Sequence, residues 1–198
     1  MTENDFLKLQ NGSDIRGVAL EGVDDEHVNL TPEVCRNIGA AFALWLSAKT
    51  GRRTESLVIG IGRDSRLSGE SLEKALTGGL AAQQVSVVRC SLATTPAMFM
   101  GTVFEQTDFD GSIMITASHL PFNRNGFKFF DKSGGLERAD ITALLRSAAL
   151  YDTAAQQCTD GQHPHAGTPS ASTGGSSTGK CRSFDLIARY SEHLRSAI

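Results

Sequence analysis

An alternation of helical and strand patterns between residues 30 and 150 constrains the fold of this chain more than any other feature. Apolar residues recur at helical spacing from Val34 to Trp45, and the apolar run at residues 57–61 is typical of a buried strand. Further helices are predicted at residues 68–83, 96–105 and 140–151, and further strands at 85–88, 112–116 and 127–130. This order predicts an α/β fold with right-handed crossovers between parallel strands.

The boundaries of the first long helix can be read from the residues that flank it. Thr31 can cap the helix, and Pro32 occupies the first helical position, where a missing N–H is not needed. Gly51 is expected to end the helix.

We therefore expect a three-layer sandwich with a mixed, mostly parallel sheet between two layers of helices. The strand at residues 127–130 is expected at an edge of this sheet. Ligands of such sheets bind beyond the carboxyl ends of the strands. The residues that follow Ile61 and Ile115 are therefore the candidates for chemistry.

The composition changes near residue 153, where Gly, Ser, Thr, Pro and Ala become dominant. We expect one domain over residues 1–152, a flexible linker or insertion over 153–182, and the start of a truncated second domain over 183–198. The amphipathic helix predicted at residues 184–198 is expected to have nothing of its own chain to pack against.

The charge and the cysteines exclude several classes of protein. A net charge of −3 gives no reason to expect a nucleic acid or an anionic membrane as partner. No apolar run reaches the length of a membrane span. The four cysteines form no CxxC pair, which favours free thiols in a reducing compartment (Cys35, Cys90, Cys158 and Cys181).

Ser118 and His119 follow the strand at residues 112–116 directly, and Lys128 lies ten residues after Ser118. A hydroxyl nucleophile beside a cation and an imidazole suits phosphoryl transfer. Taken without other information, such a Ser-His pair in a loop is structural more often than not. Pro121 is expected to stiffen the loop, and three residues are expected to supply positions that tolerate a left-handed backbone, namely Asn123, Asn125 and Gly126.

Four motifs resemble those of the α-D-phosphohexomutases, the family of phosphoglucomutase and phosphomannomutase. Residues 116–128 (TASHLPFNRNGFK) are similar to the family's active-site loop. Residues 11–17 (NGSDIRG) resemble its N-terminal loop, 62–69 (GRDSRLSG) its Gly-Arg-Asp-x-Arg segment, and 93–96 (ATTP) a Thr-Pro helix start. The resemblance covers residues 9–150 in the expected order and implies the fold of the family's first domain.

The resemblance implies a role for each matching residue. Ser118 would be the phosphoserine, which exchanges its phosphoryl group with a hexose phosphate through a bisphosphate intermediate. Arg16 and Lys128 would stabilise the phosphoryl charge and help proton transfer, and His119 would support the phosphate or a proton shuttle. Arg63 and Arg66, by contrast, are expected to form structural ion pairs with Asp64 or a neighbouring acid.

The family also implies a cofactor and further domains. The phosphate on Ser118 would bind Mg²⁺ together with carboxylates of a second domain, which this chain does not contain. A hexose 1,6-bisphosphate would act as activator. The chain alone is therefore expected to be catalytically incompetent, and the missing domains or a partner chain are its expected partners, besides the hexose phosphate. A non-catalytic module that binds a sugar phosphate or a partner is the alternative.

Two departures from the family pattern affect the interpretation. Gly12-Ser13-Asp14 replaces the usual Thr-Ser-Gly, and Leu120 replaces an asparagine, which removes a side-chain amide from the phosphate loop and affects the expected substrate preference. The choice between glucose and mannose stays open, because the resemblance assigns sugar recognition to a domain that these residues do not include. The sequence around these positions resembles a divergent subgroup from photosynthetic eukaryotes. A cytoplasmic or plastid location is expected, although no targeting segment is visible.

Three other motifs do not indicate a function. Residues 174–180 fit the first seven places of a nucleotide-binding P-loop, but Cys181 stands where a hydroxyl is required. His163 and His165 are a weak metal-ligand set. A Ser-His hydrolase is disfavoured because the chain lacks a Gly-x-Ser-x-Gly elbow.

Overall fold

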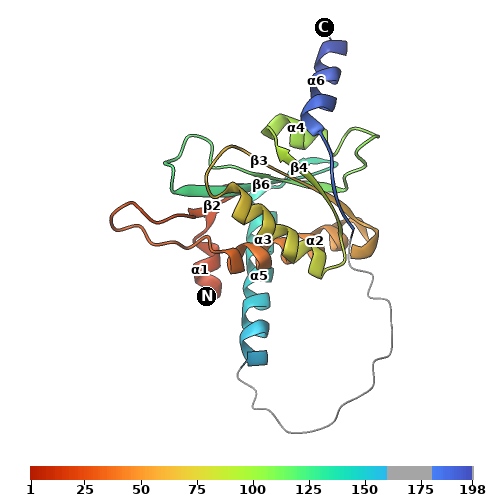
Figure 1. The fold of residues 1–198 in the computed structure, drawn as a ribbon. Helices are drawn as coiled ribbons and strands as arrows, with labels where there is room; N and C mark the ends of the chain where they lie inside the picture. The colour runs from red at the N-terminus through yellow and green to blue at the C-terminus, as the bar shows by residue number, and fades with distance from the viewer. Residues whose placement is uncertain (160–179, 198) are drawn as a thin grey trace, which may run out of the picture.

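A mixed β-sheet between two layers of helices forms the fold, which a computed structural model describes for residues 1–159 and 180–197 (Figure 1). The helices are α1 (Glu3–Leu7), α2 (Pro32–Thr50), a short 3₁₀ turn η1 (Thr54–Ser56), α3 (Gly69–Ala82), α4 (Thr95–Met100), α5 (Arg138–Thr159) and α6 (Leu186–Ser196). The strands are β1 (Gln10–Asn11), β2 (Asp14–Val18), β3 (Val58–Arg63), β4 (Ser86–Leu92), β5 (Gly111–Ile115), β6 (Arg124–Asp131), β7 (Gly134–Gly135) and β8 (Cys181–Ser183).

The strands lie in the order β1-β2-β6-β5-β3-β4-β8, and β7 pairs with β6. The pairs of β3 with β4, β3 with β5 and β4 with β8 are parallel, whereas the other four pairs are antiparallel. The predicted α/β sandwich with a mixed sheet is confirmed, with a larger antiparallel share than expected. The prediction that residues 127–130 form an edge strand is wrong, because the hairpin β1-β2 covers the outer side of β6.

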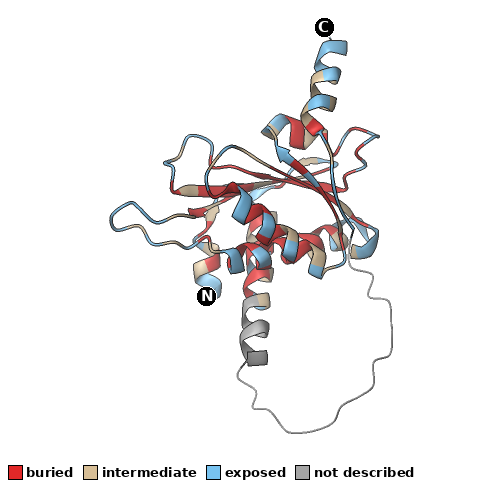
Figure 2. Ribbon diagram, in the orientation of Figure 1, coloured by how far each residue is buried: buried red, intermediate tan, exposed pale blue. Residues whose placement is uncertain are grey.

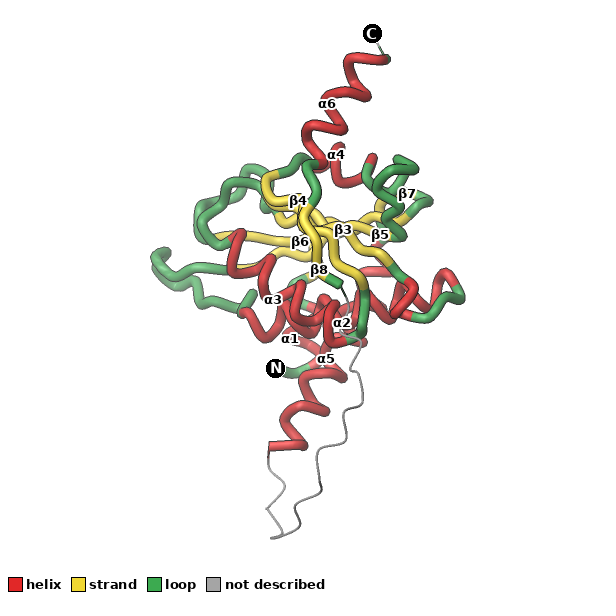
Figure 3. Tube along the Cα trace, turned by 45° about the vertical axis from the view of Figure 1, so that its right-hand side comes forward, coloured by secondary structure: helices red, strands yellow, loops and turns green. Residues whose placement is uncertain are grey.

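Each face of the sheet packs against its own helical layer. Helices α1, α2, α3 and α5 cover one face, and α4 and α6 cover the other (Figure 3). Successive residues of a strand point to opposite faces, so Ile113 and Ile115 of β5 join the larger core while Met114 joins the smaller one. Strand β5 is buried along its whole length, as Figure 2 shows for the centre of the sheet.

Helix α2 has the predicted ends. The hydroxyl of Thr31 accepts the N–H of Val34, Pro32 opens the helix, and Gly51 ends it in the left-handed region with φ 67°. Helix α4 is shorter than predicted, because it ends at Met100 with Gly101 as its cap. Helix α5 is longer, since it continues beyond Tyr151 to Thr159.

Residues near the C-terminus add to the sheet and to the smaller core. Cys181 and Arg182, expected in the linker, belong to β8, which runs parallel to β4. The expectation that the following helix lacks a packing surface is wrong for its first turns, because buried Leu186 packs beside α4, with Ile187 and Tyr190 partly buried on the same cluster. The division of the chain at residues 152 and 182 stays a prediction.

The described part of the chain contains no helix that is both long and apolar enough to cross a membrane. Its cysteines Cys35, Cys90 and Cys181 are free thiols. Burial raises the pKa of the Cys90 thiol to about 12 and that of Cys35 still further, so both stay protonated at neutral pH. The side chain of Cys158, the P-loop-like residues 174–179, His163 and His165 lie outside the described residues.

Helices α2 and α3 approach each other closely where each carries a glycine. A Cβ atom on Gly79 would lie 1.9 Å from the carbonyl oxygen of Arg36, and one on Gly39 would lie 2.5 Å from that of Leu76. Only glycine permits such a contact between helix backbones. The helical layer on this face therefore depends on both positions.

Gly79→Ala is expected to lower the free energy of unfolding by about 1–3 kcal/mol, because α2 and α3 must separate to admit the methyl group. The matched control is Gly78→Ala in the same helix, where no atom lies within 4 Å of the added Cβ. That control is expected to be neutral or to stabilise by up to about 1 kcal/mol. Urea unfolding measures both, and equal effects of the two substitutions would contradict the packing argument.

Candidate active site

Ser118 lies in the loop that joins the buried strand β5 to β6. The loop leaves the sheet after Ile115, and Ser118 adopts a left-handed backbone with φ 56°. Its N–H donates to the hydroxyl of Thr116 at 3.0 Å, and its side chain is exposed. A non-glycine residue in this region costs free energy and requires support from its surroundings. The loop therefore presents the Ser118 hydroxyl to solvent from a rigid base.

The left-handed residue of this loop is thus Ser118 and not one of the residues predicted from their type. None of the three predicted residues, Asn123, Asn125 and Gly126, has a positive φ. Gly126 is needed for a different reason, because a Cβ there would lie 2.1 Å from the carbonyl oxygen of Ile15 in the neighbouring strand β2.

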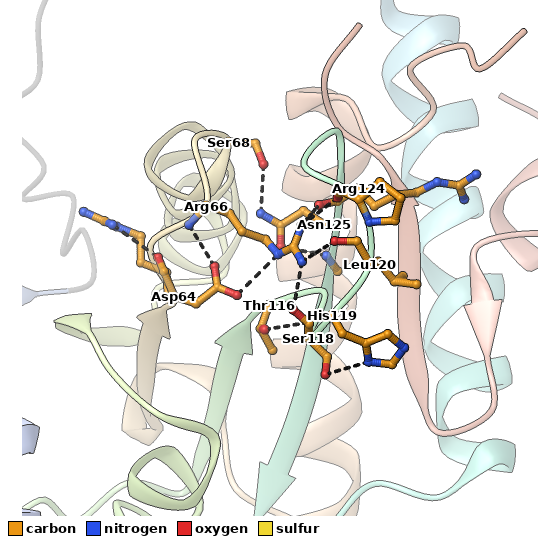
Figure 4. Close-up of polar contacts among 12 residues, drawn as sticks. Asp64, Arg66, Ser68, Thr116, Ser118, His119, Leu120, Arg124 and Asn125 are labelled. Atoms are coloured by element: carbon orange, nitrogen blue, oxygen red, sulfur yellow. Dashed lines mark hydrogen bonds and ion pairs between the residues drawn. The ribbon is translucent and has the colours of Figure 1, made fainter. Parts of the chain in front are cut away.

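The guanidinium group of Arg66 binds the backbone of the loop that contains Ser118. Its Nη2 donates to the carbonyl oxygens of Ser118 at 2.8 Å and Leu120 at 2.7 Å. Its Nη1 donates to those of Pro121 at 2.8 Å and Arg124 at 3.0 Å. Figure 4 shows these contacts converging on one guanidinium group. A planar fork of donors suits this task, which an ammonium group could not perform.

The ion pairs predicted for Arg63, the last residue of β3, and for Arg66, which follows the strand, are confirmed. Arg66 Nε lies 3.5 Å from Asp64, and Arg63 pairs with Glu70 at 2.6 Å and with buried Glu73 at 3.2 Å. The prediction missed that Arg66 also binds the Ser118 loop. The signal available was its place after the carboxyl end of β3, which lies beside β5 in the sheet.

Arg16 and Lys128 lie on the neighbouring strands β2 and β6 and share one acid. Asp14 Oδ2 lies 2.8 Å from Arg16 Nη2 and 2.6 Å from Lys128 Nζ. Arg16 Nη1 also donates to the carbonyl oxygen of Thr116, which fixes the guanidinium beside the base of the Ser118 loop. The N-terminal motif expected as a loop is thus a β-hairpin, with Arg16 on its second strand. Asp14 was not predicted as a site residue.

A hollow of about 250 Å³ lies beside Ser118, and Asp14 and Arg16 form part of its wall. Its lining consists of Asn11, Asp14, Arg16, Ala117, Ser118, His119 and Leu120. His119 is exposed, and its Nδ1 lies 3.3 Å from Ser118 Oγ. The structure thus brings Ser118, His119 and Arg16 to one hollow, and Lys128 joins them through Asp14.

Glu26, which precedes α2 in the chain, also binds the loop. It accepts hydrogen bonds from the side chains of Asn123 at 2.6 Å and Arg124 at 3.2 Å. The backbone amides of Ala19 and Leu20 donate to the carbonyl oxygen of Asn123, so the residues that follow β2 also lie beside the loop. The guanidinium of Arg124 and the amide of Asn123 hold the pKa of Glu26 below its usual range.

The described residues do not form a complete site for the Mg²⁺ that the resemblance implies. Among the side chains that the structure describes, in residues 1–151 and 180–197, no three His, Cys, Asp or Glu are placed to hold a metal ion together. Asp14, the acid that lines the hollow, is already paired with Arg16 and Lys128. A phosphate on Ser118 is the ligand that this part of the chain could add.

Comparison with known proteins identifies the family. Residues 7–154 match the family model described as phosphoglucomutase/phosphomannomutase, alpha/beta/alpha domain I. The chain belongs to the phosphoglucomutase/phosphomannomutase family. Its resemblance to these mutases, inferred above from four motifs, is thereby confirmed, and so is the fold of the family's first domain.

Individual mutases of the family are similar over the same region. The phosphoglucosamine mutase of Natranaerobius thermophilus is 40% identical over 127 residues, which cover 64% of this chain and 25% of that protein. The phosphoglucosamine mutase of Desulforudis audaxviator is 39% identical over 120 residues, which cover 61% of this chain and 24% of that protein. The chain thus spans about a quarter of the length of these curated relatives.

A solved structure of a phosphoglucomutase/phosphomannomutase family protein from Burkholderia thailandensis superimposes with a TM-score of 0.68 and 25% identity. It covers 100% of this chain, which in turn spans 36% of the solved one. These relatives do not test the resemblance to a subgroup from photosynthetic eukaryotes, which stays a prediction. The cytoplasmic or plastid location also stays a prediction.

The ion contact of Glu26 with Arg124 is expected to stabilise the Ser118 loop at neutral pH and to be lost in acid. Because the pKa of Glu26 is lowered in the folded protein, this stabilisation is complete above the usual glutamate pKa of about 4.3 and is lost as the pH falls through the lower folded value. The NMR signal of the Arg124 Nε–H group is expected to shift in that acidic range. Glu26→Gln should abolish the shift and Glu21→Gln, an exposed position in the same segment, should keep it. An unchanged titration in the Glu26→Gln protein would contradict the assignment.

Proposed function

We propose that this chain is the phosphoserine domain of a phosphohexomutase, which interconverts a hexose 1-phosphate and a hexose 6-phosphate. Ser118 would carry the phosphoryl group. The observation that carries the proposal is the combination of an exposed, left-handed Ser118 with Arg16 and His119 around one hollow. The family membership supports the same reaction class.

In the first step the Ser118 oxygen would form a bond to a phosphorus atom of the hexose 1,6-bisphosphate, and the bond from that phosphorus to the sugar oxygen would break. His119, at 3.3 Å from Ser118 Oγ, would take the hydroxyl proton, and the departing sugar oxygen would take up a proton. The products are phosphorylated Ser118 and a hexose monophosphate. In the second step the free hydroxyl oxygen of a hexose monophosphate would form a bond to the phosphorus on Ser118, and the bond from that phosphorus to the Ser118 oxygen would break. The sugar hydroxyl would release its proton, the Ser118 oxygen would take one up, and the bisphosphate would be regenerated. Because the two steps can act at different ends of the sugar, together they interconvert the 1-phosphate and the 6-phosphate.

Arg16 and Lys128 would stabilise the negative charge on the transferred group and assist proton transfer at the sugar hydroxyl. Arg66 would keep Ser118 in place through its backbone carbonyl. Mg²⁺, which the family implies, would neutralise part of the phosphate charge and would need ligands beyond the described residues.

The proposal names the substrate only as a hexose phosphate and does not specify the sugar. Relatives with up to 40% identity are named phosphoglucosamine mutases, which adds glucosamine phosphate to the glucose and mannose phosphates considered from the sequence. The identity of these relatives with this chain concerns only a quarter of their length, and the loop around Ser118 contacts the phosphoryl group rather than the sugar ring in the proposed mechanism.

Incubation with glucose 1,6-bisphosphate and Mg²⁺ is expected to add one phosphoryl group to the protein, because Ser118 is exposed and Arg16 and His119 lie beside it in the hollow. This single transfer is distinct from turnover of a hexose phosphate, which is not expected of this chain alone. Intact-mass spectrometry with peptide mapping measures the addition and its position. Ser118→Ala should show none, whereas Ser13→Ala, an exposed serine of the nearby hairpin, should be phosphorylated like the unchanged protein. Absence of phosphorylation in the unchanged protein would contradict the proposal and favour a non-catalytic binding module.

A further inference from the structure

Asp14 binds both cations that the proposed function assigns to the phosphoryl group. One oxygen, Oδ2, accepts from Arg16 Nη2 at 2.8 Å and from Lys128 Nζ at 2.6 Å. The Asp14 side chain is only 15% exposed, and that of Arg16 only 12%. The contact of Asp14 with Arg16 therefore has little access to water and is strong compared with exposed pairs, while the Lys128 side chain is 30% exposed.

The strand pairing fixes this arrangement. Asp14 and Arg16 lie two residues apart on β2 and therefore on the same face of the sheet. Lys128 follows Phe127, which pairs with Ile15, so its side chain meets the same face from β6. The second hydrogen bond of Arg16, to the carbonyl oxygen of Thr116, prevents the guanidinium from drifting. The three charges thus have defined positions before any ligand binds.

Asp14 also lines the hollow that contains Ser118. A phosphoryl group on Ser118 would bring a charge of about −1.5 to −2 into this hollow, which has the same sign as Asp14. The two anions would compete for the same cations, Arg16 and Lys128. A carrier that must both accept and release a phosphoryl group works best when it does not hold the group too tightly.

We propose that Asp14 is a built-in counter-anion, which pairs Arg16 and Lys128 when Ser118 is free and weakens their hold on a phosphate in the hollow. The benefit for group transfer rests on the proposed function. The competition itself does not, because it concerns only the affinity of the hollow for an anion. The proposal also gives a purpose to Asp14 at a position where the resembled motif has glycine.

Inorganic phosphate is the probe for this competition. It can be titrated into the protein while NMR follows the backbone amides of Ser118 and His119. Asp14→Asn removes the charge with little change in shape and is expected to bind phosphate about tenfold more tightly than the unchanged protein. Asp14→Glu keeps the charge and should bind as weakly as the unchanged protein. Asp24→Asn makes the same charge change at an exposed position outside the hollow and should have little effect.

Equal or weaker phosphate binding by Asp14→Asn would overturn the proposal, and so would tight binding by both Asp14 variants. The amide spectrum reports whether each variant is folded, and Asp14→Ser offers a second neutral side chain should the asparagine variant unfold. The two proposals fail separately. A tenfold gain with no phosphorylation of Ser118 by glucose 1,6-bisphosphate would reject the mutase reaction and leave the counter-anion in place.

Discussion

The guanidinium group of Arg66 joins the two parts of the molecule on which the site depends, the rigid sheet and the exposed loop. Arg66 follows the carboxyl end of β3. It donates hydrogen bonds to four carbonyl oxygens of the loop that follows β5, those of Ser118, Leu120, Pro121 and Arg124. Without these donors the loop would have to satisfy its carbonyl groups in other ways and would lose its single conformation. The left-handed backbone of Ser118 then has a physical basis in its surroundings.

Charged residues from three parts of the chain surround this loop. Arg66, paired with Asp64, binds four carbonyl oxygens of the loop, and Glu26 binds the side chains of Asn123 and Arg124 in the same loop. The hairpin β1-β2 contributes Arg16 and Asp14, so that a hollow beside Ser118 has both a cation and an anion in its wall. Such a balance suits a group that must be bound and then released.

Local patterns predicted much of the fold. The ends of α2 followed from Thr31, Pro32 and Gly51, because capping depends on neighbouring residues alone. The edge position of residues 127–130 was predicted wrongly, since the pairing of β6 with β2 joins segments about 110 residues apart and leaves no local signal. The packing of α6 against α4 was missed for the same reason.

The site shows the same division between local and distant information. Ser118 and His119 could be proposed from their place after a buried strand and from the family motif. The hydrogen bonds of Arg66 to this loop were not predicted. Its place after the carboxyl end of β3 was the one local signal, because its acceptors are backbone carbonyls more than 50 residues away and every residue has such a carbonyl. Asp14 was noted only as a departure from the family pattern, and its contact with Lys128 depends on the register of β2 with β6.

Arg66 holds the Ser118 loop in the conformation that presents the serine. Hydrogen exchange of the loop amides measures it most directly, with Arg66→Lys compared to Arg53→Lys, an arginine that is 86% exposed and far from the loop in sequence. Arg66→Lys is expected to speed exchange at Ser118, Leu120 and Arg124 by more than about tenfold, while Arg53→Lys leaves it unchanged. Unchanged loop exchange in a folded Arg66→Lys protein would show that Arg66 does not hold the loop.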